Sequence, residues 1–88
     1  MDDASVAATD APPSARARWA RLTERQREIA TRIALGERRE EISAALGVSI
    51  KTFDTHRGDI LWRLEARGTA DLTRLAIAAG VITVEVEQ

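Results

Sequence analysis

The 88-residue sequence predicts an all-α domain of four helices behind a disordered N-terminal tail. In four separate segments, apolar residues recur at intervals of three and four, as they do on the inner face of a helix. Each segment is bounded by residues that cap or end helices. Gly47 separates two of the segments at a spacing that indicates two short helices joined by a tight turn.

The chain is predicted to divide into a disordered tail over residues 1–18, the helical domain over 19–82 and a C-terminal tail over 83–88. The beginning of the chain contains Pro12-Pro13 and shows no helical or strand period. Residues 83–87 alternate like a short strand but are too few to decide. An initiating methionine ahead of a disordered segment favours a stand-alone domain.

The first two helices are predicted over about residues 24–35 and 38–45. Thr23 is placed as the N-cap of the first helix, and Gln26 can complete a capping box. Gly36 supplies the left-handed position after that helix. The second helix is short and shows charged residues to solvent. The inward-facing residues of the two helices are predicted to be Ile29, Ala30, Ile33, Ala34, Ile42, Ala45 and Leu46.

The third and fourth helices are predicted over about residues 50–66 and 70–79. Ser49 is placed to cap the third helix, and Gly80 ends the fourth. Their predicted inner residues are Phe53, Ile60, Leu61 and Leu64, followed by Leu72, Leu75, Ala76 and Ala79. The outer side of the third helix is predicted to carry Lys51, Asp54, Thr55, Gly58 and Trp62.

Composition argues against several classes of protein. The chain has no cysteine and one histidine, so neither a disulfide framework nor a thiolate metal site is available, and no cofactor is expected. No apolar run approaches the roughly 20 residues that span a membrane, and the acidic start is unlike a signal peptide, so a cytoplasmic protein is expected. No phosphate-binding glycine loop or His-Glu metal motif supports an enzyme.

Charge is distributed unevenly along the chain. The net charge of −1 argues against a protein that attracts any polyanion. Residues 19–68, however, carry two more cations than anions, whereas residues 1–18 and 69–88 carry more anions. The middle of the chain is therefore weakly basic.

Residues 22–82 resemble the LuxR-type helix-turn-helix domain, the output module of quorum-sensing regulators and of many response regulators. The matching positions are Leu22-Thr23, Arg25, Gly36, Glu41-Ile42, Leu46, Val48-Ser49, Lys51-Thr52, His56-Arg57, Ile60-Leu61, Leu64, Leu72, Ala76-Ile77 and Gly80. The His56-Arg57 pair and the fourth helix separate this family from region four of sigma factors, which also opens with a Leu-x-x-Arg stretch.

The resemblance implies that the third helix enters the major groove of double-stranded DNA and that the fourth helix pairs two copies into a homodimer. The expected DNA-binding residues are Lys51, Thr52, Asp54, Thr55, His56 and Arg57, with Arg38 and Arg39 on the helix that would cross the phosphate backbone. For His56 the family role is divided between packing and phosphate contact. The residues expected at the dimer contact are Leu72, Leu75, Ala76 and Ala79.

Three residues depart from the family pattern. Asp54 stands where Lys or Arg is common, Gly58 stands where a base-contacting side chain is frequent, and Phe53 replaces the usual Val. A carboxylate can accept a hydrogen bond from cytosine N4, but it repels phosphate. Glycine inside a helix costs about 1 kcal/mol relative to alanine, although it can permit a close approach of the backbone. The larger Phe53 is expected to tilt or shift the third helix unless a smaller neighbour compensates.

Two functions follow from these patterns. The first is a sequence-specific DNA-binding regulator of transcription that acts as a dimer through its fourth helix. The second is a protein-interaction module on the same scaffold that binds RNA polymerase or another regulator, with weak or no DNA binding. The retained Lys51-Thr52 and His56-Arg57 pairs favour the first. The acidic balance, together with Asp54, favours the second.

Overall fold

The computed structural model describes residues 13–84, and their regular structure is entirely helical. The helices are α2 (Ala15–Trp19), α3 (Glu24–Ala34), α4 (Arg39–Leu46), α5 (Ile50–Leu64) and α6 (Thr69–Ala78). The all-α prediction is confirmed, and α3 to α6 match the four predicted helices within two residues at each end. The predictions for residues 1–12 and 85–88 lie outside the described residues.

Local capping explains where these helices begin and end. Thr23 and Gln26 form the expected capping box at the start of α3. The Ser49 hydroxyl accepts a hydrogen bond from the Thr52 amide and caps α5. Gly36 and Gly47 both have positive φ, at 88° and 72°. The sequence signals for these boundaries are therefore confirmed.

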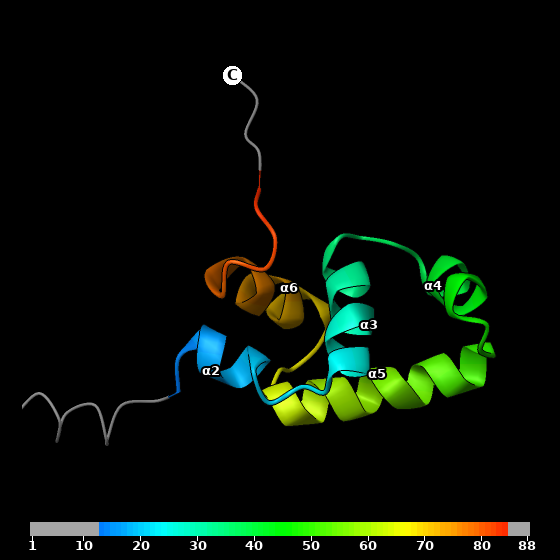
Figure 1. The fold of residues 1–88 in the computed structure, drawn as a ribbon, viewed down its shortest axis with the longest axis horizontal. Helices are drawn as coiled ribbons and strands as arrows, with labels where there is room; N and C mark the ends of the chain where they lie inside the picture. Colours follow the sequence, from blue (N-terminus) through cyan, green and yellow to red (C-terminus); the bar gives the residue numbers. More distant parts are fainter. Residues whose placement is uncertain (1–12, 85–88) are drawn as a thin grey trace, which may run out of the picture.

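The helices pack around α3, which crosses α5 and lies between α4 and α6 (Figure 1). Its inward residues meet the buried side of α5, so the long helix has one face in the core and the other in solvent. The buried apolar residues are Trp19, Leu22, Ile29, Ala30, Ile33, Ala34, Ile42, Phe53, Ile60, Leu64, Leu72, Leu75, Ala76 and Ala79.

One predicted core residue is wrong. Ala45 is exposed, whereas Ser43 is buried beside Ile42. The buried face of α4 is centred between Ile42 and Ser43 and includes the partly buried Leu46. At about 100° per residue, Ala45 lies nearly a third of a turn, about 110°, from the centre of that face. An alanine carries too little apolar surface to turn the helix toward itself.

Helix α2 corrects the predicted tail, because residues 15–18 are helical rather than disordered. Ser14 caps this helix by accepting a hydrogen bond from the Ala17 amide, and Trp19 is only 6% exposed. A five-residue helix has almost no stability of its own. It persists here because Trp19 joins the core and because α2 packs against α5 and α6.

The C-terminal end of α5 also differs from the prediction. The helix ends at Leu64 instead of residue 66, because Glu65 adopts a left-handed conformation with φ 58°. The Ala66 amide then donates to the Leu61 carbonyl at 2.9 Å. Gly68, which suggested the later stop, is extended with φ 177°.

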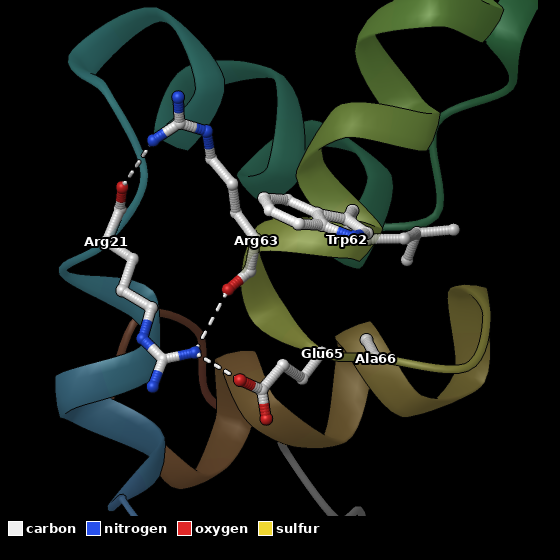
Figure 2. Close-up of a pocket in the computed structure, with 6 residues that line it drawn as sticks. Arg21, Trp62, Arg63, Glu65 and Ala66 are labelled. Atoms are coloured by element: carbon white, nitrogen blue, oxygen red, sulfur yellow. Dashed lines mark hydrogen bonds and ion pairs between the residues drawn. The ribbon is translucent and has the colours of Figure 1, made fainter.

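Two arginines from the start of the domain hold this end of α5, and we call Arg18 and Arg21 the arginine clamp. Arg18 donates from Nε to the Leu64 carbonyl and from Nη2 to the Glu65 carbonyl, each at 2.8 Å. Arg21 Nη1 donates to the Arg63 carbonyl at 3.3 Å and to Glu65 Oε2 at 3.0 Å (Figure 2). These donors satisfy carbonyls that a helix C-terminus leaves unpaired, and their charge suits its dipole.

Candidate nucleic-acid interface

The turn between α4 and α5 fixes the direction in which α5 leaves the core. Gly47 ends α4 with φ 72° and ψ 31°, a left-handed conformation that costs glycine little. The Val48 amide donates to the Ser43 carbonyl at 3.0 Å, and Ser49 then caps α5. The direction of α5 relative to α4 is therefore fixed within the three residues between the two helices.

The outer face of α5, which we define as Lys51, Asp54, Thr55, Gly58 and Trp62, is exposed at every position. The opposite face buries Phe53, Ile60 and Leu64. The predicted helical phase is thereby confirmed. Because the buried residues anchor the helix, the outer face presents its polar groups on a rigid support.

The two threonines of α5 use their hydroxyl groups differently. Thr52 Oγ1 accepts a hydrogen bond from Ser49 Oγ at 3.0 Å, so its own proton is available to a ligand. Thr55 Oγ1 donates to the Lys51 carbonyl at 3.2 Å, which leaves its lone pairs available. Both side chains are exposed. One threonine can thus donate to an incoming molecule and the other can accept from it.

Within residues 13–84, two predicted DNA-binding cations have no acidic partner. Lys51 is exposed, and among residues 13–84 no carboxylate lies within 4.0 Å of its ammonium group. Arg57 is partly buried, and its Nη2 donates to the neutral hydroxyl of Thr69 at 2.9 Å. That bond ties α5 to the beginning of α6 without cancelling the charge. His56 is partly buried.

Arg38 and Arg39 have acidic partners. Arg38 Nη2 lies 3.7 Å from Glu41 Oε2. Arg39 Nη1 lies 3.4 Å from Asp54 Oδ2, and its Nε lies 3.6 Å from Glu40 Oε2. These pairs are exposed and weak, so phosphate can compete for the guanidinium groups at a modest cost. The ion pair between Arg39 and Asp54 joins residues 15 apart in sequence, and no local sequence pattern predicts it.

The residues predicted for a dimer contact do not lie on the surface of the domain. Leu72, Leu75, Ala76 and Ala79 are buried in the core of their own chain, with exposed fractions between 0% and 8%. Their apolar period is explained by packing against α2 and α3. This assignment is corrected, because side chains already covered by their own protomer offer no surface to a second copy. The exposed residues of α6 are Thr69, Ala70, Arg74, Ile77 and Ala78.

A shallow apolar pocket borders the other end of α5. It is lined by Arg21, Leu61, Trp62, Arg63, Glu65 and Ala66. Trp62 is 81% exposed, and its indole lies beside the pocket (Figure 2). No helix in the described part of the chain is long and apolar enough to cross a membrane. Between residues 13 and 84, no cluster of three His, Asp or Glu side chains could hold a metal ion.

Comparison with known proteins agrees with this arrangement. The family model described as bacterial regulatory proteins, luxR family, matches residues 20–76. The transcriptional regulatory protein TdiR of Thauera aromatica is 40% identical over 53 residues, covering 60% of this chain and 23% of that protein. The transcriptional regulatory protein FixJ of Rhizobium meliloti (strain 1021) is 30% identical over 77 residues, covering 88% and 38%.

A third relative is the response regulator UvrY of Escherichia coli (strain K12), which is 34% identical over 74 residues, or 84% of this chain and 34% of that protein. The chain thus spans less than half the length of these curated relatives. The family match covers more than half of the chain and includes α3, α4 and α5 in full. The chain belongs to the luxR family of bacterial regulatory proteins.

Proposed function

We propose that this chain is a sequence-specific DNA-binding regulator of transcription whose α5 enters the major groove. The observation that carries the proposal is the exposed polar outer face of α5, on a helix whose other face is anchored in the core. The major groove admits an α-helix and displays a distinct pattern of donors and acceptors for each base pair. The relatives named as transcriptional regulatory proteins support the same role.

The charges at this face support modest electrostatic affinity. Lys51 and Arg57 are available to phosphate, whereas Arg38 and Arg39 must leave acidic partners. Each neutralised phosphate contributes a slope of about −0.9 to the dependence of log K on log salt concentration. Two to four such contacts per chain give a slope of roughly −2 to −4.

We further propose that two copies bind together through the exposed side of α6. Ile77 is 39% exposed on this helix, with Ala78 beside it in sequence. A pair of copies would let the two α5 helices read half-sites about one helical turn apart. Ile77→Lys is expected to reduce dimer formation in sedimentation measurements while leaving the helical content unchanged. An unchanged dimer would exclude this side of α6.

The first test is selection of bound fragments from a random duplex library, followed by fluorescence anisotropy on the enriched duplexes across a salt series. An enriched two-fold motif with the slope given above is expected. Lys51→Ala is expected to weaken binding, whereas Arg25→Ala, which removes an exposed cation from α3, serves as the matched control. The absence of any enriched motif, with weak binding lost at physiological salt, would contradict the proposal.

One observation favours the second candidate function, a protein-interaction module. The exposed indole of Trp62 beside an apolar pocket is typical of a residue that anchors a protein partner. If no duplex is enriched, capture of purified RNA polymerase by the wild-type chain, but not by Trp62→Ala, would support this candidate. If the wild-type chain and Trp62→Ala both enrich the same duplex, DNA binding does not require Trp62 and this second candidate is not supported as the main function.

A further inference from the structure

The pair formed by Arg39 and Asp54 lies at the junction of the two helices that flank the turn. Arg39 is the first residue of α4, and Asp54 is in the second turn of α5. Nη1 of Arg39 is nearly equidistant from the two carboxylate oxygens, at 3.5 Å from Oδ1 and 3.4 Å from Oδ2. The side chains are 54% and 49% exposed, so the pair faces solvent.

This geometry leaves the carboxylate able to accept further hydrogen bonds. An ionised carboxylate has about four lone-pair sites, and a single guanidinium nitrogen at long range satisfies only part of them. The nearby positive charge also offsets the repulsion that Asp54 would exert on DNA phosphates. Asp54 therefore keeps acceptor capacity on the outer face while its electrostatic penalty is reduced.

Gly58 lies one turn further along α5 on the same face and has no side chain that could keep the helix away from DNA. A Cβ placed on Gly58 would meet no protein atom within 4 Å, so no packing requirement explains the absence of a side chain. The missing side chain leaves room for the helix backbone to approach a surface closely. A close approach suits Asp54, because its carboxylate extends only a short way from the helix.

We propose that Asp54 is a specificity-determining residue that accepts a hydrogen bond from the N4 amino group of a cytosine in the major groove, with Arg39 as its positioning residue. Cytosine presents a donor at this edge, whereas guanine and thymine present acceptors that a carboxylate repels. Adenine offers a donor at N6, but its neighbouring N7 is an acceptor. The inference rests on the proposed function and adds the base that α5 selects.

The decisive experiment compares the motifs enriched from a random duplex library by the wild-type chain and by Asp54→Asn. The wild-type chain is expected to require cytosine at one position of each half-site, with about tenfold or greater discrimination. Asparagine can both donate and accept, as adenine N7 and N6 require. Asp54→Asn is therefore expected to change that single position to adenine and to leave the other positions unchanged.

The matched control is Asp59→Asn, which removes an exposed carboxylate from the same helix. Asp59 lies about 140° around α5 from Asp54, at roughly 100° per residue. Because Asp59→Asn removes a negative charge without changing the outer face, this variant is expected to bind all duplexes more tightly and to keep the wild-type motif. A change of base preference in Asp59→Asn would show that charge alone alters the motif, and this would overturn the assignment to Asp54.

The role of Arg39 is measured by the ratio of affinities for duplexes with cytosine and with guanine at the selected position. Arg39→Ala is expected to lower this ratio severalfold, and Arg39→Lys is expected to recover part of it. A general loss of affinity at a constant ratio would show an ordinary phosphate contact and overturn the positioning role. Circular dichroism of each variant checks that the helices remain.

Failure of the inference and failure of the proposed function give different results. If the wild-type chain enriches a motif and Asp54→Asn enriches the same bases at every position, Asp54 reads no base and the inference is overturned, although the protein still binds DNA specifically. If the wild-type chain enriches nothing, the proposed function is overturned and the inference falls with it.

Discussion

The two ends of α5 are held in opposite ways. At its C-terminal end, the arginine clamp brings donors from more than 40 residues away to the carbonyls of Arg63, Leu64 and Glu65. At its N-terminal end, the polar contacts are local or weak: the cap from Ser49 and the long pair between Arg39 and Asp54. The C-terminal end therefore contributes to the stability of the domain, whereas the polar groups of the N-terminal end remain available to a ligand. Substitutions at the first should change the free energy of unfolding, and substitutions at the second should change DNA binding.

The largest effect is expected from Trp19→Ala, which removes the core side chain of α2. Truncating a buried aromatic residue costs about 3 to 5 kcal/mol of unfolding free energy, comparable to the whole stability of a small domain. Urea denaturation followed by circular dichroism measures the loss. Trp62→Ala is the control, because that side chain is 81% exposed and its removal should change stability by less than about 0.5 kcal/mol. If the two variants lost the same unfolding free energy, Trp19 would not be a core residue that stabilises α2.

Arg18→Ala should destabilise the domain by about 1.5 to 2 kcal/mol, since two carbonyls at the end of α5 lose charged donors. The same denaturation measurement applies, and the enriched DNA motif should be unchanged. Arg25→Ala, which breaks only an exposed pair with Glu28 on α3, should stay within about 0.5 kcal/mol of the wild type. A changed motif in Arg18→Ala would mean that the two ends of α5 are coupled.

Arg57→Ala should weaken binding to all duplexes alike and reduce the salt slope by about one unit. Anisotropy at several salt concentrations gives the slope. The control is Thr69→Ala, which removes the hydrogen-bond partner of Arg57 while keeping its charge. If Thr69→Ala reduced the slope as much as Arg57→Ala does, the arginine would act by holding α6 in place instead of contacting phosphate.

The smallest effect is expected from Gly58→Ala, which should stabilise the domain by about 0.5 to 1 kcal/mol. A Cβ at this helical position meets no protein atom within 4 Å. Gly47→Ala should have the opposite sign, because φ there is 72° and alanine is strained in that conformation. Thermal unfolding compares the two variants. Destabilisation by Gly58→Ala would show that α5 is distorted at this position.

Most of the fold could be predicted because its signals are local. Thr23, Ser49 and Gly47 bond to residues three or four positions away, and the apolar period of α5 assigns its faces correctly. Helix α2 escaped prediction because its Ala-Arg alternation has no helical period, and only tertiary contacts keep it folded. The end of α5 escaped because Glu65 carries no sequence signal for a left-handed conformation.

The candidate site was predictable in its position but not in its internal partners. The exposure of the outer face of α5 follows from helical phase. The pairing of Arg39 with Asp54, by contrast, depends on how α4 packs against α5. The apolar residues of α6 illustrate the opposite error, because a period of three and four does not reveal whether a helix buries its stripe in its own core or against a second copy.

The two tryptophans make the molecule its own optical reporter. Trp19 is 6% exposed in the core beside the arginine clamp, and Trp62 is 81% exposed on α5. A buried indole emits at shorter wavelength and resists soluble quenchers, whereas an exposed one emits at longer wavelength and is quenched readily. A single emission spectrum therefore carries two signals, the blue component reporting unfolding of α2 and the red component reporting a partner that covers α5.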